Sequence, residues 1–179
     1  MAELPSNDPA EAERLVRAAI RDTFASVAGV GHVYDRVRLP DEGNDEELKS
    51  TIPDPVTETP LLNIAMVTFN GPSEDEYTDD THTELILDYS ISFDLGFVDR
   101  WVRTSGPVLE FDNSTDLFNA IMMRARRAFK DNRTLGYEGV VHHYLRADGS
   151  AALITDEDTG GRQHAVDFSL RVVVTGGTV

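Results

Sequence analysis

The sequence contains no cysteine. Disulfides, iron–sulfur clusters, thiolate zinc sites and cysteine nucleophiles are therefore all excluded. Long apolar runs are missing as well, since none approaches the roughly 18 residues of a membrane-spanning helix. The first residues, MAELPSNDPAEAERL, lack the basic and apolar segments of a signal peptide. We therefore expect no membrane partner, and a protein that stays in the cytosol or is packaged from it.

Positive charge is scarce, and lysine is scarcer still. The 179 residues include 32 acidic and 16 basic side chains, which gives a formal net charge of −16, and the only lysines are Lys49 and Lys130. Tight nucleic-acid binding draws its affinity from Lys and Arg side chains that displace counterions from phosphates. We therefore expect no tight binding of nucleic acid. The shortage of lysine fits either a high-salt cytoplasm, where screening weakens self-repulsion, or a GC-rich coding bias.

Two segments have the pattern of amphipathic helices. The stretch DPAEAERLVRAAIRDTFASV opens with Asp8 as N-cap and Pro9 at the first helical position, and Gly29 can end the helix in a left-handed conformation. A second helix is expected over residues 115–130, with Ser114 as N-cap. Each has one apolar stripe. The stripes are Leu15, Val16, Ala19, Ile20 and Phe24 in the first helix, and Leu117, Phe118, Ile121, Met122, Ala125 and Phe129 in the second.

The strand signals surround these helices. Strands are expected in HVYDRVRL, where Val33 and Val37 face the core, and in LLNIAMVTFN, TELILDYSISFDLGF, GVVHHYLRA and HAVDFSLRVVV, with a short one at residues 152–155. WVRTSGPVLEF is expected to be irregular or a short edge strand. Two strands alternate strictly between apolar and polar residues. Their buried rows are Leu85, Leu87, Tyr89, Ile91, Phe93 and Leu95, and Val166, Phe168, Leu170, Val172 and Val174.

These elements predict one α+β domain over residues 1–179, a mostly antiparallel β-sheet with two main helices packed on one face. Residues 40–60 and 71–82 are rich in acids and in loop-forming residues, so we expect long acidic loops there. Residues 175–179 are expected to be a flexible tail.

No motif predicts a catalytic centre. The stretch GVGHVYDRVRL lacks the third glycine of a dinucleotide fingerprint, and it lies between a helix and a strand rather than between a strand and a helix. P-loop, GxSxG and SxxK motifs do not occur. Carboxylates are too numerous for any two to define an acid–base pair. We therefore expect no enzymatic activity and no cofactor.

The histidines leave one alternative open. His142 and His143 are adjacent on a predicted strand and so point to opposite faces, but either one can combine with His164 across paired strands in a small cytosolic metal-binding hydrolase. The simpler interpretation is exposed or core-edge histidines with no metal. Two acidic stretches, SEDEYTDD and DEDTGG, lack the ligand spacing of a calcium-binding EF-hand loop and are expected to be solvated. A cytosolic adaptor of a salt-adapted cell is a third hypothesis.

A quarter of the cations fall on one helix, at Arg124, Arg126, Arg127 and Lys130. This group is either an ordinary solvated face or a contact for an acidic loop of an identical neighbour. In the second case the acids would come from positions such as Asp45, Glu46 and Glu47 of the first acidic loop. Such a contact joins two different surfaces head to tail, which allows a very acidic subunit to form a ring.

The order of the elements resembles a known family. VAGVGHVYDRVRL follows the first helix, a long polar loop precedes LLNIAMVTFNG, WVRTSG precedes FDNSTDLFNAIMMRARRAFKDNRTLG, and HAVDFSLRVVV closes the chain. This layout is similar to the tail terminator and tail completion proteins of long-tailed bacteriophages and related prophage elements. The resemblance implies a structural subunit of the virion tail or neck that assembles in the host cytoplasm as a hexameric ring. Its implied partners are the tail tube protein, whose polymerisation it ends, and the head connector, to which it joins the tail.

Overall fold

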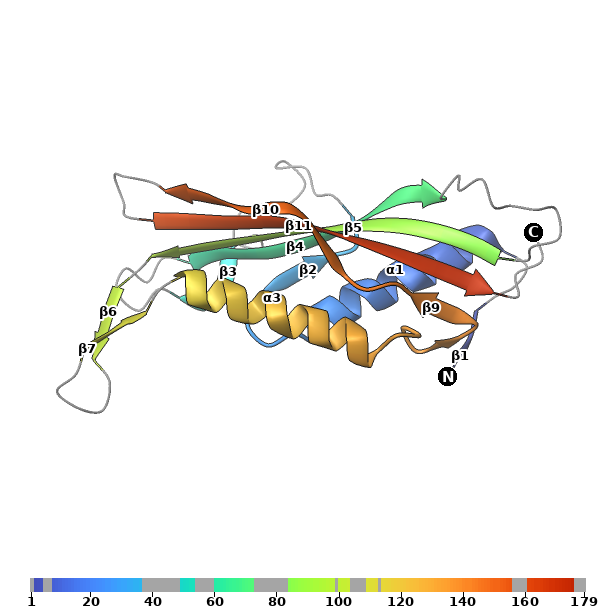
Figure 1. Ribbon diagram of the computed structural model, residues 1–179, viewed down its shortest axis with the longest axis horizontal. Helices are drawn as coiled ribbons and strands as arrows, with labels where there is room; N and C mark the ends of the chain where they lie inside the picture. The colour runs from blue at the N-terminus through green and yellow to red at the C-terminus, as the bar shows by residue number, and fades with distance from the viewer. Residues whose placement is uncertain are drawn as a thin grey trace.

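The computed structural model describes residues 2–4, 8–36, 49–53, 60–72, 84–98, 100–103, 109–112, 114–155 and 161–175. Over these residues the chain has the expected α+β fold, with two helices on one face of a mainly antiparallel sheet (Figure 1). The elements are β1 (Ala2–Glu3), α1 (Pro9–Ala25), β2 (His32–Tyr34), β3 (Lys49–Pro53), β4 (Pro60–Pro72), β5 (Glu84–Val98), β6 (Arg100–Arg103), β7 (Leu109–Asp112), α3 (Ser114–Asp131), β8 (Tyr137–Glu138), β9 (Val140–His142), β10 (Arg146–Thr155) and β11 (Gly161–Thr175).

The main sheet has the order β10-β11-β5-β4-β2. Its centre is the long antiparallel pair of β5 and β11, in which Gly161 lies opposite Val98 and Thr175 lies opposite Glu84. β2 follows α1 and the turn after it, and it pairs in parallel with β4 at the edge of the sheet. β3 pairs with the start of β4, and β9 pairs with the last residues of β11.

The core lies between the helices and the sheet, and Phe24 of α1 is at its centre. The Phe24 ring centroid lies 5.8 Å from that of Phe93, 6.4 Å from that of Phe129 and 6.1 Å from that of Phe168, so one side chain joins α1, α3, β5 and β11. The expected apolar rows of both strands supply the sheet side. From β5 these buried residues are Leu87, Tyr89, Ile91, Phe93 and Leu95, and from β11 they are Val166, Phe168, Leu170, Val172 and Val174.

The start of α1 is fixed as the sequence predicts. The Asp8 carboxylate accepts hydrogen bonds from the amides of Ala10, at 3.0 Å, and Glu11, at 3.2 Å, and Pro9 is the first helical residue. These bonds satisfy amides that have no partner within the helix. The other end differs from the prediction, because α1 stops at Ala25 with Ser26 as its C-cap rather than at Gly29.

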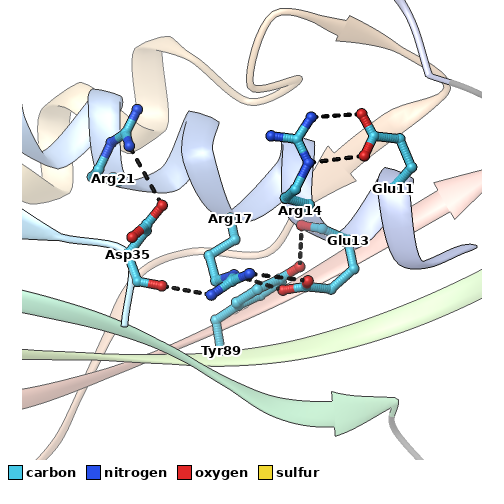
Figure 2. A network of polar contacts seen from close by, with 7 residues as sticks. All are labelled: Glu11, Glu13, Arg14, Arg17, Arg21, Asp35 and Tyr89. Atoms are coloured by element: carbon cyan, nitrogen blue, oxygen red, sulfur yellow. Dashed lines mark hydrogen bonds and ion pairs between the residues drawn. The ribbon is translucent and has the colours of Figure 1, made fainter. Parts of the chain in front are cut away.

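Polar contacts hold the outer part of α1 to the sheet (Figure 2). Glu13 and Arg17 form a largely buried ion pair, with 2.9 Å between Oε1 and Nε. The Tyr89 hydroxyl donates to the Glu13 carbonyl oxygen at 3.4 Å, and Arg17 donates to the Asp35 carbonyl oxygen at 2.7 Å. Burial, with a further contribution from the Glu13 carboxylate, raises the pKa of Tyr89, so its phenol stays protonated. Two exposed pairs, Arg14 with Glu11 and Arg21 with Asp35, complete the network in Figure 2.

The glycines after α1 form a turn that is held from β4. Gly29 has a φ of +98°, as the sequence predicts for a left-handed position. The side chain of Asn63, which is almost fully buried, accepts from the Gly31 amide at 2.9 Å and donates to the Gly29 carbonyl oxygen at 2.9 Å. A Cβ at Gly31 would overlap the Asn63 carbonyl oxygen, so glycine is required there for close backbone approach.

Several expected boundaries were wrong. Residues 40–60 are not a continuous loop, because Lys49–Pro53 pairs with β4 as β3, a contact that composition does not reveal. Gly71 and Pro72 belong to β4 rather than to the loop expected at 71–82, and Thr175 is the last residue of β11 rather than part of the tail expected at 175–179. Residues 73–82 and 176–179 lie outside the described residues. The strand expected from His32 to Leu39 is His32–Tyr34 within the described residues, and Val37 lies outside them.

The segments before and after α3 also differ from the prediction. WVRTSGPVLEF contributes to an antiparallel hairpin of β6 and β7. Ser114 is the first helical residue rather than the cap. GVVHHYLRA is split into β9 and the start of β10, because the chain passes along β11 twice: β9 pairs with Val172–Val174, and β10 pairs with residues 162–169. The short strand expected at 152–155 is the end of β10.

Candidate subunit interface

A shallow hollow of about 630 Å³ lies where the exposed side of α3 meets the connection between β9 and β10. Two of its lining residues are large apolar side chains in solvent, Met123, 65% exposed, and Tyr144, 63% exposed. Three others are the cations Arg126, Arg127 and Lys130. Methionine, tyrosine and arginine are enriched in protein–protein interfaces. We call the set Met123, Arg126, Arg127, Lys130 and Tyr144 the α3 patch.

The helix period brings the α3 part of the patch together. Met123, Arg126, Arg127 and Lys130 follow the spacing i, i+3, i+4, i+7, which places them on one face of α3. The opposite face is buried in the core through Phe118, Ile121, Ala125 and Phe129. The three cations therefore lie close together in solvent, on a chain whose net charge is −16.

The cations of the α3 patch are largely available to a partner. Arg127 pairs with Asp131 at 3.5 Å, but both side chains are more than half exposed, and such pairs contribute at most about 1 kcal/mol. Arg126 and Lys130 have no carboxylate partner within the described residues. An acidic partner therefore gains attraction here without breaking a buried ion pair.

Tyr144 is placed by the step of the chain from β9 to β10. His142 is buried, and its amide donates to the Arg133 carbonyl oxygen at 3.1 Å, while the His143 amide donates to the Arg171 carbonyl oxygen at 2.8 Å. The next residue, Tyr144, therefore turns outward. The Arg133 guanidinium lies 5.1 Å from the centre of the Tyr144 ring, a cation–π contact that holds the ring beside the end of α3.

The basic surface continues past Tyr144. Tyr144 also borders a second hollow, of about 570 Å³, whose lining includes His143, Arg146 and Arg171. Arg171 forms an ion pair with Asp88 in this hollow, with 2.9 Å between Nε and Oδ1. Tyr144 is thus an exposed aromatic side chain between two basic hollows.

The structure separates Arg124 from the other predicted contact residues. Its guanidinium donates to the Ala28 carbonyl oxygen at 3.0 Å, toward α1 and the glycine turn. Arg124 does not line the hollow that Arg126, Arg127 and Lys130 share. We assign it to the α1–α3 contact instead. The predicted acidic partners Asp45, Glu46 and Glu47 lie outside the described residues.

Sequence reasoning missed Met123, Arg133 and Tyr144. The signal for Met123 was present, since it shares the helical spacing of the cations. No local pattern points to Tyr144, because GVVHHYLRA has the pattern of one continuous strand. The outward turn of the chain between β9 and β10, where Tyr144 lies, is not visible in that pattern.

The structure does not bring the histidines of the metal alternative together. His142 is opposite Val172 in the β9–β11 pair, eight positions along β11 from His164, or about 26 Å at the usual rise per residue. His164 stacks on Phe118 with 5.0 Å between ring centres, and His143 is exposed. Within the described residues no three His, Asp or Glu side chains converge as metal ligands.

The face of the sheet opposite the helices is polar and acidic. Asp88, Asp94, Asp148 and Asp167 lie on this face of β5, β10 and β11, which we call the outer sheet face. Cross-strand bonds order three of these aspartates: Ser92 donates to Asp167 at 2.6 Å, Ser169 to Asp148 at 3.1 Å, and Gln163 to Asp94 at 3.2 Å.

Asp94 is a partly buried carboxylate of the outer sheet face. Burial raises the pKa of Asp94; the Gln163 hydrogen bond opposes this shift, and the charge of Asp167 adds to it. Asp94 and Asp167 on the outer sheet face therefore repel each other.

No protein-family model and no curated protein sequence matches the chain. Neither helix of the described part is long and apolar enough to cross a membrane.

Proposed function

We propose that this protein is a structural, non-enzymatic subunit of a virion tail or neck. Copies assemble head to tail into a ring, of six subunits in the resembled family, that ends the tail tube and joins it to the head connector. The α3 patch is the observation that carries this proposal. A −16 chain that collects exposed arginine, methionine and tyrosine at one hollow has a surface suited to an acidic partner, and copies of the same chain are such partners.

The separation of charge over the fold supports a ring with an acidic channel. The cations of the α3 patch lie on the helix side of the molecule, whereas the outer sheet face carries the four aspartates together with Arg146 and Arg171. With the outer sheet face toward the channel, DNA is expected to pass without tight binding, because the four aspartates outnumber the two arginines on that wall and Arg171 is already paired with Asp88. A strongly positive channel in an assembled ring would overturn this orientation.

The first experiment measures assembly by light scattering at low and high salt. We expect wild-type particles to lose mass as salt rises, because screening weakens contacts between exposed charges. The variant Arg126→Glu/Lys130→Glu is expected to stay monomeric at concentrations where the wild type assembles.

The matched control is Arg14→Glu/Arg36→Glu. It makes the same change in net charge, and both arginines are exposed and outside the α3 patch. We expect the control to assemble more than the patch variant does. Equal loss of assembly in both variants would show that total charge alone is responsible, and would contradict the role of the α3 patch.

The second experiment tests the tail role directly. The neighbouring genes are searched for a tail tube protein, that protein is polymerised with and without this chain, and tube lengths are measured by negative-stain microscopy. We expect shorter tubes with a ring at one end, and normal lengths with Arg126→Glu/Lys130→Glu. Unchanged tube lengths with the wild-type protein would refute the capping function.

A further inference from the structure

The described cations that have no carboxylate partner are not spread evenly over the molecule. Acidic side chains outnumber basic ones by 32 to 16 in this chain, so a cation without such a partner does not reflect a shortage of carboxylates. Within the described residues, the arginines that form ion pairs are Arg14, Arg17, Arg21, Arg127 and Arg171. The described cations with no carboxylate partner are Arg36, Arg124, Arg126, Lys130, Arg133 and Arg146.

Four of the latter group surround Tyr144. The ring is 63% exposed and lines the hollow of the α3 patch together with Arg126 and Lys130. It also lines the second hollow, of about 570 Å³, together with Arg146. The Arg133 guanidinium lies 5.1 Å from the centre of the ring. One exposed aromatic side chain therefore has cations that lack a carboxylate partner in both of the hollows that it borders.

The second hollow lies where two strands depart from a regular ladder. Residues 143–145 lie between the ladder of β9 and that of β10, which begins with Arg146 opposite Ser169. On the other side of the hollow, β4 has an irregular register between Phe69 and Gly71, and Gly71 has a φ of +114°. Such bulges are frequent beside functional sites. The hollow therefore follows from the path of the backbone and not from side-chain rotamers alone.

The acids that border these hollows already have partners. In the second hollow Arg171 holds Asp88 through two bonds, of 2.9 Å from Nε to Oδ1 and 3.2 Å from Nη2 to Oδ2. In the hollow of the α3 patch, Asp131 pairs with Arg127 at 3.5 Å. A two-fold contact of this surface with itself would therefore place the remaining cations against each other. Carboxylates from a different surface are favoured instead.

We propose that Tyr144 is the centre of one carboxylate-binding surface, formed by the α3 patch, Arg133 and Arg146, and that an acidic segment of a neighbouring copy crosses it. This inference rests on the proposed head-to-tail assembly and extends the contact from α3 to the start of β10. The occupant is a second copy because the chain carries a net charge of −16 and because Tyr144 makes the second hollow continuous with the α3 patch. Arginine forks fit carboxylates, and exposed tyrosines are frequent energetic centres of interfaces.

Carbodiimide cross-linking tests which copy supplies the carboxylates. The reagent joins a lysine amine to a carboxylate in direct contact, with loss of water, and does not couple arginine. Because the only lysines are Lys49 and Lys130, few other side chains compete. The variant Arg146→Lys places an amine in the second hollow and keeps the charge. Arg36→Lys is the matched control, because Arg36 is also exposed and without a described carboxylate partner, but lines neither hollow.

Isotope labelling shows which cross-links join two copies. Equal amounts of labelled and unlabelled chains are mixed, cross-linked and digested, and a link between copies contains one peptide of each kind. We expect such mixed links from Lys130 and from the introduced amine at position 146, and none from the amine at position 36. Mixed links at position 146 that do not exceed those at position 36 would overturn the carboxylate-binding surface.

The strength of self-association gives a second readout, by sedimentation equilibrium. Arg146→Glu and Tyr144→Ala are each expected to weaken self-association roughly tenfold or more. Tyr144→Phe keeps the ring, and Arg36→Glu makes the same charge change as Arg146→Glu, so both controls are expected to stay within about threefold of the wild type. Circular dichroism establishes that each variant is folded. Equal weakening by Arg146→Glu and Arg36→Glu would contradict the role of the second hollow.

The outcomes separate this surface from the proposed function. If Arg126→Glu/Lys130→Glu stays monomeric while Arg146→Glu behaves as Arg36→Glu does, the proposed function stands and the extended surface is overturned. Mixed links at position 146 together with unchanged tube lengths would support the surface and refute the tail role. A wild-type protein that is monomeric at every concentration tested would overturn both.

Discussion

Replacing Asn63 with alanine is expected to reduce the free energy of unfolding by about 1–3 kcal/mol, although the side chain does not line the hollow of the α3 patch. Asn63 makes two hydrogen bonds of 2.9 Å to the glycine turn, and each contributes about 0.5–1.5 kcal/mol. The side chain is 1% exposed, so water does not replace it readily. Because the turn places β2 against β4, part of the sheet edge is expected to loosen with it.

The near-isosteric Asn63→Asp separates hydrogen bonding from shape. The introduced carboxylate can still accept from Gly31, but it faces the Gly29 carbonyl oxygen with no proton to donate. An uncompensated charge at a buried position costs about 3–5 kcal/mol, so we expect this variant to be less stable than Asn63→Ala at pH 7.

The difference between the two Asn63 variants is expected to depend on pH. Burial holds the pKa of the introduced carboxyl above its unfolded value, so its cost is fully present above the folded pKa and disappears as pH falls through it. Urea unfolding of both variants between pH 7 and pH 4 measures this, and using Asn63→Ala as the reference at each pH cancels the titration of other groups. Equal stability of Asn63→Asp and wild type at pH 7, or a difference from Asn63→Ala that does not change with pH, would refute the reasoning.

Three further predictions concern stability. Gly31→Ala is expected to destabilise the fold by at least about 2 kcal/mol more than Gly136→Ala, because a methyl group at Gly31 overlaps the Asn63 carbonyl oxygen. At Gly136 nothing lies within 4 Å of a Cβ, and alanine costs only the strain of the positive φ. Urea unfolding compares the two variants, and equal losses of stability would contradict the close approach at Gly31. Phe24→Ala should lower the free energy of unfolding by about 3–5 kcal/mol, because it removes the ring that joins both helices to the sheet. Phe24→Leu is the control and should lose less. Thermal unfolding measures both variants, and a loss below about 1 kcal/mol for Phe24→Ala would argue against this packing. Asp94→Asn should be more stable than wild type at pH 7, because the folded-state pKa of Asp94 is raised and its ionised form is disfavoured. The gain in unfolding free energy should shrink as pH falls through that pKa, because the wild-type carboxyl then becomes protonated. An equal gain at pH 7 and pH 4 would count against the electrostatic cause.

The core could be predicted from the sequence because it depends on local periodicity. The alternation of β5 and β11 and the helical spacing of α1 and α3 assign each buried row before any partner is known. A shift of one residue in β5 would place Asp88 and Asp94 in the core, so burial enforces the register that the pattern indicates. The α+β fold follows from the same pattern.

The candidate site could be predicted only in part. Helical spacing brings Arg126, Arg127 and Lys130 together, and it correctly indicated one basic surface. It grouped Arg124 with them, although the contact of Arg124 with the Ala28 carbonyl oxygen depends on how α1 packs against α3. Tyr144 depends on the division of one apolar segment between β9 and β10, which follows from pairing with β11 and not from the segment itself.

The glycine turn after α1 shows the division between sequence and tertiary structure. The sequence alone determined that GVGHVYD is a turn from a helix into a strand and that it lacks the dinucleotide fingerprint, because the order of elements and the glycine count are local properties. Only the tertiary structure decided why the second glycine is needed, since Asn63 approaches it from β4, 32 positions away in the chain. Propensity and periodicity act over a few residues, whereas a shared hollow, a strand division or a buried amide depends on which distant segments meet when the core closes.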